Sequence, residues 1–115
     1  MACPWYVYIV ANHTREEIYI GVVLDIGTDA RPAGPKASVE DRWKDHCRGD
    51  TATISHWNCA RDSTQLMGYC RTTSQRKASE YAHELERNAK SLARMCPEAA
   101  KLFDAGYGIH LTAGL

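Results

Sequence analysis

The sequence lacks long hydrophobic runs and an excess of charge of either sign. The longest apolar run in its 115 residues, Ile18 to Leu24, is far shorter than the ~18 residues that a membrane-spanning helix needs. Lysine and arginine total 14 and balance 14 acidic residues, so the charge excess of a disordered chain is missing too. A domain of this size folds without a disulfide or a metal. We therefore expect one globular domain over residues 1–115.

The cysteines lack the pattern of a disulfide framework. There are five, an odd number, and no two form a close Cys-x-x-Cys pair, which suits free thiols in a reducing cytosol. Residues 1–6 contain no basic side chain and lead directly into a strand-like run, so no signal peptide is expected. We predict a cytoplasmic protein without membrane contact.

The zero net charge bears on nucleic-acid binding in particular. Proteins that bind the phosphate backbone usually carry a basic excess, which is absent here. Strong, sequence-independent binding of DNA is therefore not expected. Four basic residues could still form a local patch for nucleic acid: Arg31, Lys36, Lys44 and Arg48.

The hydrophobic pattern predicts an α+β domain with a small, mostly antiparallel, three-stranded sheet. Two runs of β-branched and aromatic residues, 5–10 and 17–24, flank a short polar connection and predict a β-hairpin. Residues 25–37 hold two prolines and two glycines and indicate a long loop. A third strand is expected at 64–71.

Helices are expected to flank this β-β-α-β-α core, followed by a short α-β appendage. Ser38 is the expected N-cap of a helix of about ten residues that ends at Arg48-Gly49. Apolar periodicity within 76–95 predicts one longer helix, with cap candidates at 72–75. Pro97 begins a short helix up to Asp104, and 106–112 resemble a closing strand or an ordered tail.

Two tyrosines and a glycine on the predicted hairpin are candidate site residues. Strand propensity alone explains Tyr8 and Tyr19. Gly21 would let a ligand approach the backbone, although a β-bulge explains it as simply.

A second candidate pair, Arg42 and His46, has i,i+4 spacing and shares one face of the first predicted helix. Arginine can hold a phosphate through two hydrogen bonds, and a neutral histidine one turn away can accept a proton. The pair suits phosphodiester chemistry, but an exposed pair without any role is the alternative.

Glutamates on the longer predicted helix are candidate metal ligands: Glu80, Glu84 and Glu86. Mixed-sign runs of this kind usually form a solvated helix face. One carboxylate can, however, help to hold a Mg²⁺ ion that keeps most of its waters until a substrate phosphate arrives. Spacing alone does not choose among the three.

Taken in order, these motifs make the chain similar to the GIY-YIG nuclease superfamily, as a small single-domain member. Tyr-Ile-Gly at 19–21 matches the second signature fully, and Tyr6 stands where the first signature has its glycine. Arg42 and His46 match the family's arginine helix, and the glutamate pattern fits Ala82, Glu86 and Asn88 best. The loop 25–37 is longer than the family's usual link.

The resemblance implies a metal-dependent endonuclease that hydrolyses DNA to 5′-phosphate and 3′-hydroxyl products. Glu86, with Glu80 as runner-up, would bind Mg²⁺ or Mn²⁺. Arg42 would bind the scissile phosphate. Tyr8 or Tyr19 would orient and help deprotonate the attacking water, which requires neighbours that lower the phenol pKa from ~10.

Further roles follow from the same resemblance. His46 would relay the proton, and Lys44, Arg48 and Gly21 would contact the substrate. The expected substrate is DNA, whether branched, flapped or damaged. It would be bound by the chain's own loops, by a homodimer or with a protein partner.

Two other hypotheses remain open. One is a catalytically inactive GIY-YIG-like module that binds nucleic acid or a protein partner. The other is a small metal-binding domain that uses Cys47, His56 and Cys59, because His56 and Cys59 have the two-residue gap of many zinc knuckles.

Overall fold

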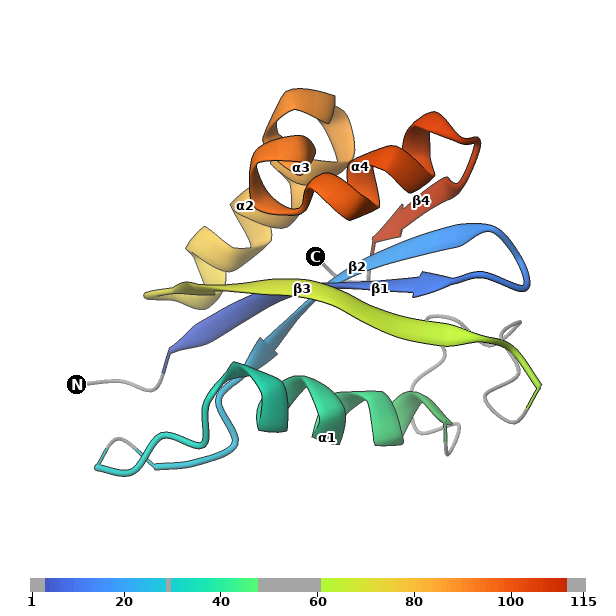
Figure 1. The fold of residues 1–115 in the computed structure, drawn as a ribbon. Helices are drawn as coiled ribbons and strands as arrows, with labels where there is room; N and C mark the ends of the chain where they lie inside the picture. The colour runs from blue at the N-terminus through green and yellow to red at the C-terminus, as the bar shows by residue number, and fades with distance from the viewer. Residues whose placement is uncertain (1–3, 29, 48–60, 112–115) are drawn as a thin grey trace.

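A central sheet separates two helical layers in the computed structural model, which describes residues 4–28, 30–47 and 61–111, without the side chains of 45–47. One helix covers one face of the sheet and three helices cover the other (Figure 1). In chain order the elements are β1 (Trp5–Asn12), β2 (Glu17–Leu24), α1 (Pro35–Cys47), β3 (Thr64–Thr72), α2 (Gln75–Arg87), α3 (Ala89–Met95), α4 (Pro97–Asp104) and β4 (Gly108–Leu111).

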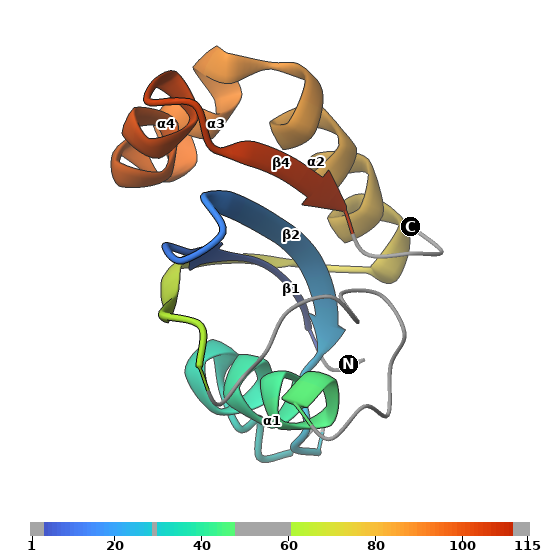
Figure 2. The same ribbon diagram turned by 90° about the vertical axis from the view of Figure 1, so that its right-hand side faces the viewer.

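The sheet has four strands in the order β3-β1-β2-β4. The hairpin and the third strand are confirmed, since β1 pairs antiparallel with both β2 and β3. The α+β class is confirmed as well, but the prediction of three strands is wrong. Residues 108–111 form a fourth strand parallel to β2, so the sheet is mixed (Figure 2).

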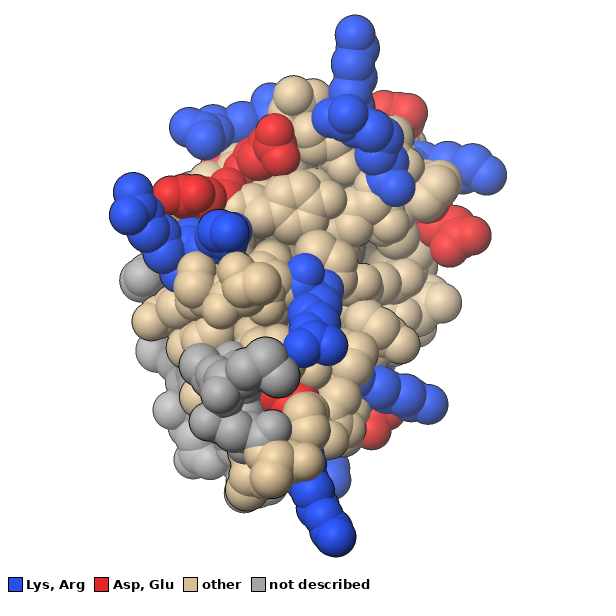
Figure 3. Space-filling view, turned by 90° about the vertical axis from the view of Figure 1, so that its left-hand side faces the viewer, with Lys and Arg blue, Asp and Glu red and all other residues tan. Residues whose placement is uncertain are grey.

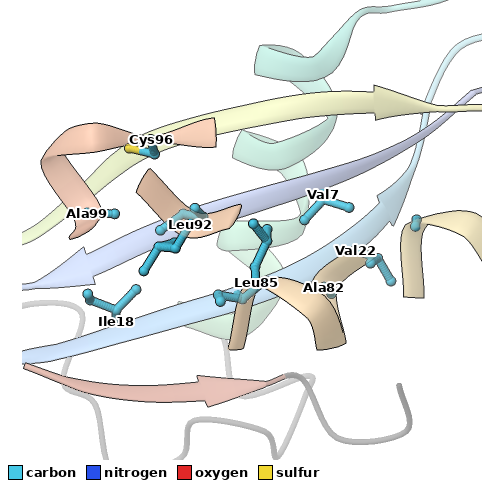
Figure 4. Close-up of a cluster of buried hydrophobic side chains, with 11 residues drawn as sticks. Val7, Ile18, Val22, Ala82, Leu85, Leu92, Cys96 and Ala99 are labelled. Atoms are coloured by element: carbon cyan, nitrogen blue, oxygen red, sulfur yellow. The ribbon is translucent and has the colours of Figure 1, made fainter. Parts of the chain in front are cut away.

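Both faces of the hairpin are buried, because residues alternate between two hydrophobic cores. On one face, the aliphatic side chains of Val7 and Ile18 pack against Leu85 of α2 and Leu92 of α3 (Figure 4). On the other face, tyrosines and Val10 pack against α1 through Val39 and Trp43. The second core is the one that contains the candidate site.

The first helix begins at Pro35, four residues before Val39, where an N-cap at Ser38 would start it. Proline suits a first helical position, because its missing N–H would have no partner there. Ser38 is therefore not the N-cap but lies within the helix. Its hydroxyl donates to the Gly34 carbonyl at 2.8 Å and accepts from the Ile26 amide at 3.1 Å, which ties the loop to the helix.

The helix predicted over 76–95 is two helices that meet at Asn88. The Asn88 side chain accepts hydrogen bonds from the amides of Lys90 and Ser91, at 3.0 and 3.3 Å, and so caps α3. Ser74 caps α2, within the predicted cap segment, and the helix that starts at Pro97 is confirmed. In the described segments, no helix has both the length and the apolar character that crossing a membrane requires.

Candidate active site

Tyr8, Tyr19 and Arg42 are connected in one hydrogen-bonded group on the α1 face of the sheet. Tyr8 lies opposite Gly21, and Tyr19 lies opposite Val10, so both rings point toward α1. Their ring centroids are 6.1 Å apart. The Tyr8 hydroxyl is hydrogen-bonded both to Tyr19 and to the guanidinium group of Arg42. The structure thus brings together three residues that the sequence placed on three separate segments.

Burial makes Tyr8 a poor base. Its side chain is 1% exposed, and Tyr19 is 0% exposed, whereas Arg42 is half-buried. Burial and the neighbouring Tyr19 raise the pKa of Tyr8 well above 10, although Arg42 acts in the opposite direction. Tyr8 is therefore a protonated hydrogen-bonding group at neutral pH. The lowering of its pKa that water activation requires is not achieved by these neighbours.

The other predicted residues near α1 are placed as follows. Gly21 is buried beside Tyr8, and Lys44 is exposed on α1. His46 lies in the last turn of α1, but its side chain is outside the described part of the chain, as is the whole of Arg48. Of the expected substrate contacts, Lys44 is accessible to a ligand.

The candidate metal ligands lie on the other side of the sheet. Glu80 and Glu86 are exposed residues of α2, and α2 packs on the face opposite to Tyr8 and Arg42. Glu80 forms a 3.1 Å ion pair with Arg76. An exposed carboxylate can ligate a hydrated Mg²⁺ ion. The chemistry of these side chains therefore suits the metal, but their position does not suit a metal that also touches the tyrosines.

Sequence reasoning missed the organising role of Asp25. This carboxylate is 3% exposed and accepts hydrogen bonds from the Tyr6 hydroxyl and from the amides of Gly27, Ala33 and Gly34, at 2.7 to 2.9 Å. Burial acts to raise the pKa of Asp25, but these hydrogen bonds outweigh it and lower the pKa from 3.8 to about 2. The signal was present as Asp-x-Gly at 25–27, the pattern of an Asx turn.

Two exposed side chains of β3 were also missed. Tyr69 lies directly opposite Tyr8, and Arg71 lies opposite Tyr6. Both therefore stand on the α1 face of the sheet, next to the buried tyrosines. The sequence signal was the alternation of Tyr69, Cys70 and Arg71 in a predicted strand.

A cavity of about 190 Å³ lies between α1 and β3, lined in part by Val39, Glu40, Trp43 and Leu66. Sites for drug-sized ligands and cofactors usually measure ~300 Å³ or more. This cavity is therefore too small to hold an organic cofactor.

The zinc hypothesis cannot be placed in this structure, because His56, Cys59 and the Cys47 side chain lie outside the described residues. In the described segments, no group of three or more His, Cys, Asp or Glu side chains is arranged to hold a metal. Comparison of the chain with known protein families, with curated proteins and with solved structures found no match. The resemblance to the GIY-YIG superfamily thus stands on the residues of this chain.

Proposed function

We propose that this protein is a metal-dependent endonuclease that hydrolyses DNA phosphodiester bonds to 5′-phosphate and 3′-hydroxyl products. The observation that carries the proposal is the contact of Arg42 with Tyr8 and of Tyr8 with Tyr19. A strand tyrosine buried only for packing needs no cation at its hydroxyl. The proposal includes the cytoplasmic location that the cysteine usage predicts.

Arg42 is the residue through which substrate would meet this group. It is half-buried, while both tyrosines are enclosed, so a phosphate on the protein surface can reach the guanidinium first. A guanidinium group binds two phosphate oxygens and stabilises the charge that develops on them. Tyr8, held protonated, accepts a hydrogen bond from the guanidinium group of Arg42 and so positions Arg42 instead of removing a proton.

The metal belongs to the proposal through the resemblance alone. Mg²⁺ or Mn²⁺ is expected, with Glu86 as its ligand and Glu80 as runner-up. His46 remains the expected proton relay. Because α1 and α2 cover opposite faces of the sheet, we assign no step of the reaction to a contact between this metal and the tyrosines.

A second candidate function is a catalytically inactive module of the same fold that binds nucleic acid or a protein partner. The burial of Tyr8 and Tyr19 favours it, since an attacking water has to reach a hydroxyl to be oriented by it. Under this hypothesis the tyrosines stabilise the core, and Arg42 is a binding residue only.

A cleavage assay with Mg²⁺ or Mn²⁺ on duplex, single-stranded, flap and junction DNA, with RNA as a control substrate, separates the two functions. We expect metal-dependent cleavage that Arg42→Ala abolishes and that Arg87→Ala, which removes an exposed cation from α2, leaves intact. Circular dichroism shows that each variant is folded. Binding without cleavage under either metal supports the inactive module, and full activity of Arg42→Ala rejects the role of Arg42.

A further inference from the structure

The outer strand β3 presents an aromatic ring and a cation side by side on the α1 face. Tyr69 is 44% exposed, and Arg71, two residues further along the strand, is exposed as well. Cross-strand partners in an antiparallel pair share a face, so Tyr69 flanks Tyr8 and Arg71 flanks Tyr6. Between them, Cys70 packs against the core on the opposite face. These two side chains form what we call the β3 platform.

Helix α1 leaves the β3 platform uncovered. The core beneath α1 includes Leu66 of β3 with Val39 and Trp43 of the helix, but it does not include Tyr69. The register of β3 against β1 shifts at Met67, an extra residue between Leu66, which lies opposite Val10, and the end of β3 that carries the platform. The ring of Tyr69 therefore stays open to solvent beside the candidate site, and among the described strands β3 lies at the edge of the sheet.

Arg71 gives the β3 platform a positive charge, which favours an anionic ligand. β3 ends and α2 begins on the side of the molecule shown in Figure 3, where basic side chains project with acidic side chains among them. Arg76 and Lys77, in the first turn of α2, are exposed cations at this end of β3, but α2 covers the face opposite to the platform and Arg76 pairs with Glu80. An exposed aromatic ring next to a cation is a combination by which proteins bind single-stranded nucleic acid, with a base on the ring and a backbone phosphate on the cation.

We propose that the β3 platform binds an unpaired nucleotide adjacent to the phosphate held by Arg42, with the base stacked on Tyr69 and a phosphate against Arg71. Only one part of this inference rests on the proposed function, namely that Arg42 holds the scissile phosphate. It narrows the substrate class to DNA with a single-stranded segment, such as a flap. A fully paired duplex keeps its bases stacked and cannot use the Tyr69 ring.

The test measures binding without cleavage. Fluorescence anisotropy with labelled single-stranded and duplex oligonucleotides, in EDTA, gives Kd values for the full chain. Tyr69→Thr removes the ring and keeps a good strand former, while Tyr69→Phe keeps the ring. Phe103→Ala is the matched control, because Phe103 is a 39% exposed ring on α4, on the other side of the sheet.

We expect Tyr69→Thr to weaken single-strand binding about tenfold, as loss of one stacked base does, and Tyr69→Phe and Phe103→Ala to leave it unchanged. Arg71→Ala should reduce the slope of log K against log salt by about 0.7, the value for one phosphate contact on a single strand. Duplex binding should change less than single-strand binding in both Tyr69→Thr and Arg71→Ala.

Several outcomes would overturn the inference. They are absence of single-strand binding by the wild type, equal Kd values for Tyr69→Thr and wild type, and equal effects of Tyr69→Thr and Phe103→Ala. A change of mass in analytical ultracentrifugation with unchanged Kd would make β3 an interface between two copies. A wild type that binds single strands through Tyr69 but cleaves no DNA would reject the proposed function and leave this inference standing.

Discussion

The hydroxyl of Tyr6 donates a 2.7 Å hydrogen bond to the carboxylate of Asp25, and so joins the first strand to the loop that follows the second. The amides of Gly27, Ala33 and Gly34 donate to the same carboxylate. Gly27, Ala33 and Gly34 are thereby gathered around one buried charge, directly before α1 begins. Because α1 carries Arg42, the Tyr6–Asp25 pair supports the candidate site without being part of it.

Replacing Asp25 by asparagine should destabilise the protein by about 2 kcal/mol at neutral pH, because hydrogen bonds to a charged acceptor are lost. The wild type should also lose stability as the pH falls from 3.8 toward 2, since the unfolded chain binds a proton at 3.8 and the folded chain at about 2. Asp25→Asn lacks this part of the pH dependence. Urea unfolding between pH 7 and pH 2 measures both effects.

Asp104 provides the control for Asp25, because it is exposed at the end of α4. Asp104→Asn should show the pH dependence of the wild type. If Asp25→Asn also follows the wild type from pH 7 to pH 2, the charge of Asp25 does not organise the loop.

Tyr8 should remain protonated in the folded protein at pH values where a free tyrosine ionises. Because its folded pKa lies above 10, its contribution to stability is present below pH 10 and is lost as the pH rises further. NMR of ¹³C-labelled tyrosine follows this titration, and Tyr8→Phe assigns the signal. Arg42→Ala should raise the pKa of Tyr8 further, since the guanidinium lowers it. Ionisation of Tyr8 below pH 10 in the folded protein would restore it as a candidate base.

The elements that could be predicted are those whose pattern is local. The hairpin and β3 follow from runs of β-branched and aromatic residues, and α4 follows from Pro97. β4 could not be predicted as firmly, because its four residues are half-exposed and depend on distant partners. The His110 Nε2 atom lies 2.6 Å from the Glu17 carboxylate, and the Gly108 amide donates to the Glu16 carbonyl. Such contacts become visible only when the chain is folded.

In the candidate site, too, local patterns predict some features, and contacts between distant segments decide the others. Alternation along paired strands fixes the face of Tyr8 and Tyr19, and i,i+3 and i,i+4 spacing along a helix fixes the face of Arg42 relative to Val39. The face of the sheet that α2 covers could not be predicted in this way. A helix that follows an edge strand can return over either side of the sheet, and apolar periodicity is satisfied on both. The sequence therefore predicted that Glu86 lies on a helix, but not that this helix lies opposite α1.

Loss of the Asn88 side chain should destabilise the protein by about 1 kcal/mol, the usual cost of removing an N-cap. Asn88→Ser should retain most of the stability, because a serine hydroxyl can accept the same amide bonds. Thermal and urea unfolding measure the difference, with Lys90→Ala as a control for an exposed change on α3. Unchanged stability of Asn88→Ala together with lost cleavage would instead make Asn88 a site residue.

Glu86→Gln should abolish metal-dependent cleavage and leave stability nearly unchanged, because the carboxylate is exposed. Glu80→Gln should leave cleavage intact and cost at most about 0.5 kcal/mol, since its ion pair with Arg76 joins side chains that are 64% and 88% exposed. Cleavage is measured across a Mn²⁺ titration. A variant that has lost one metal ligand but still binds Mn²⁺ weakly should recover cleavage at high Mn²⁺ concentration. A variant that has lost its fold should not recover cleavage.

Glu98→Gln is the control variant, because Glu98 is an exposed glutamate of α4, which covers the same face of the sheet as α2. If Glu80→Gln loses activity and Glu86→Gln does not, the metal is held near the start of α2, the end at which β3 and its platform finish. If all three variants, and Glu84→Gln as well, cleave like the wild type, the metal ligand is not one of these four glutamates. The search then moves to α1, where Glu40 and Asp41 are exposed close in sequence to Arg42.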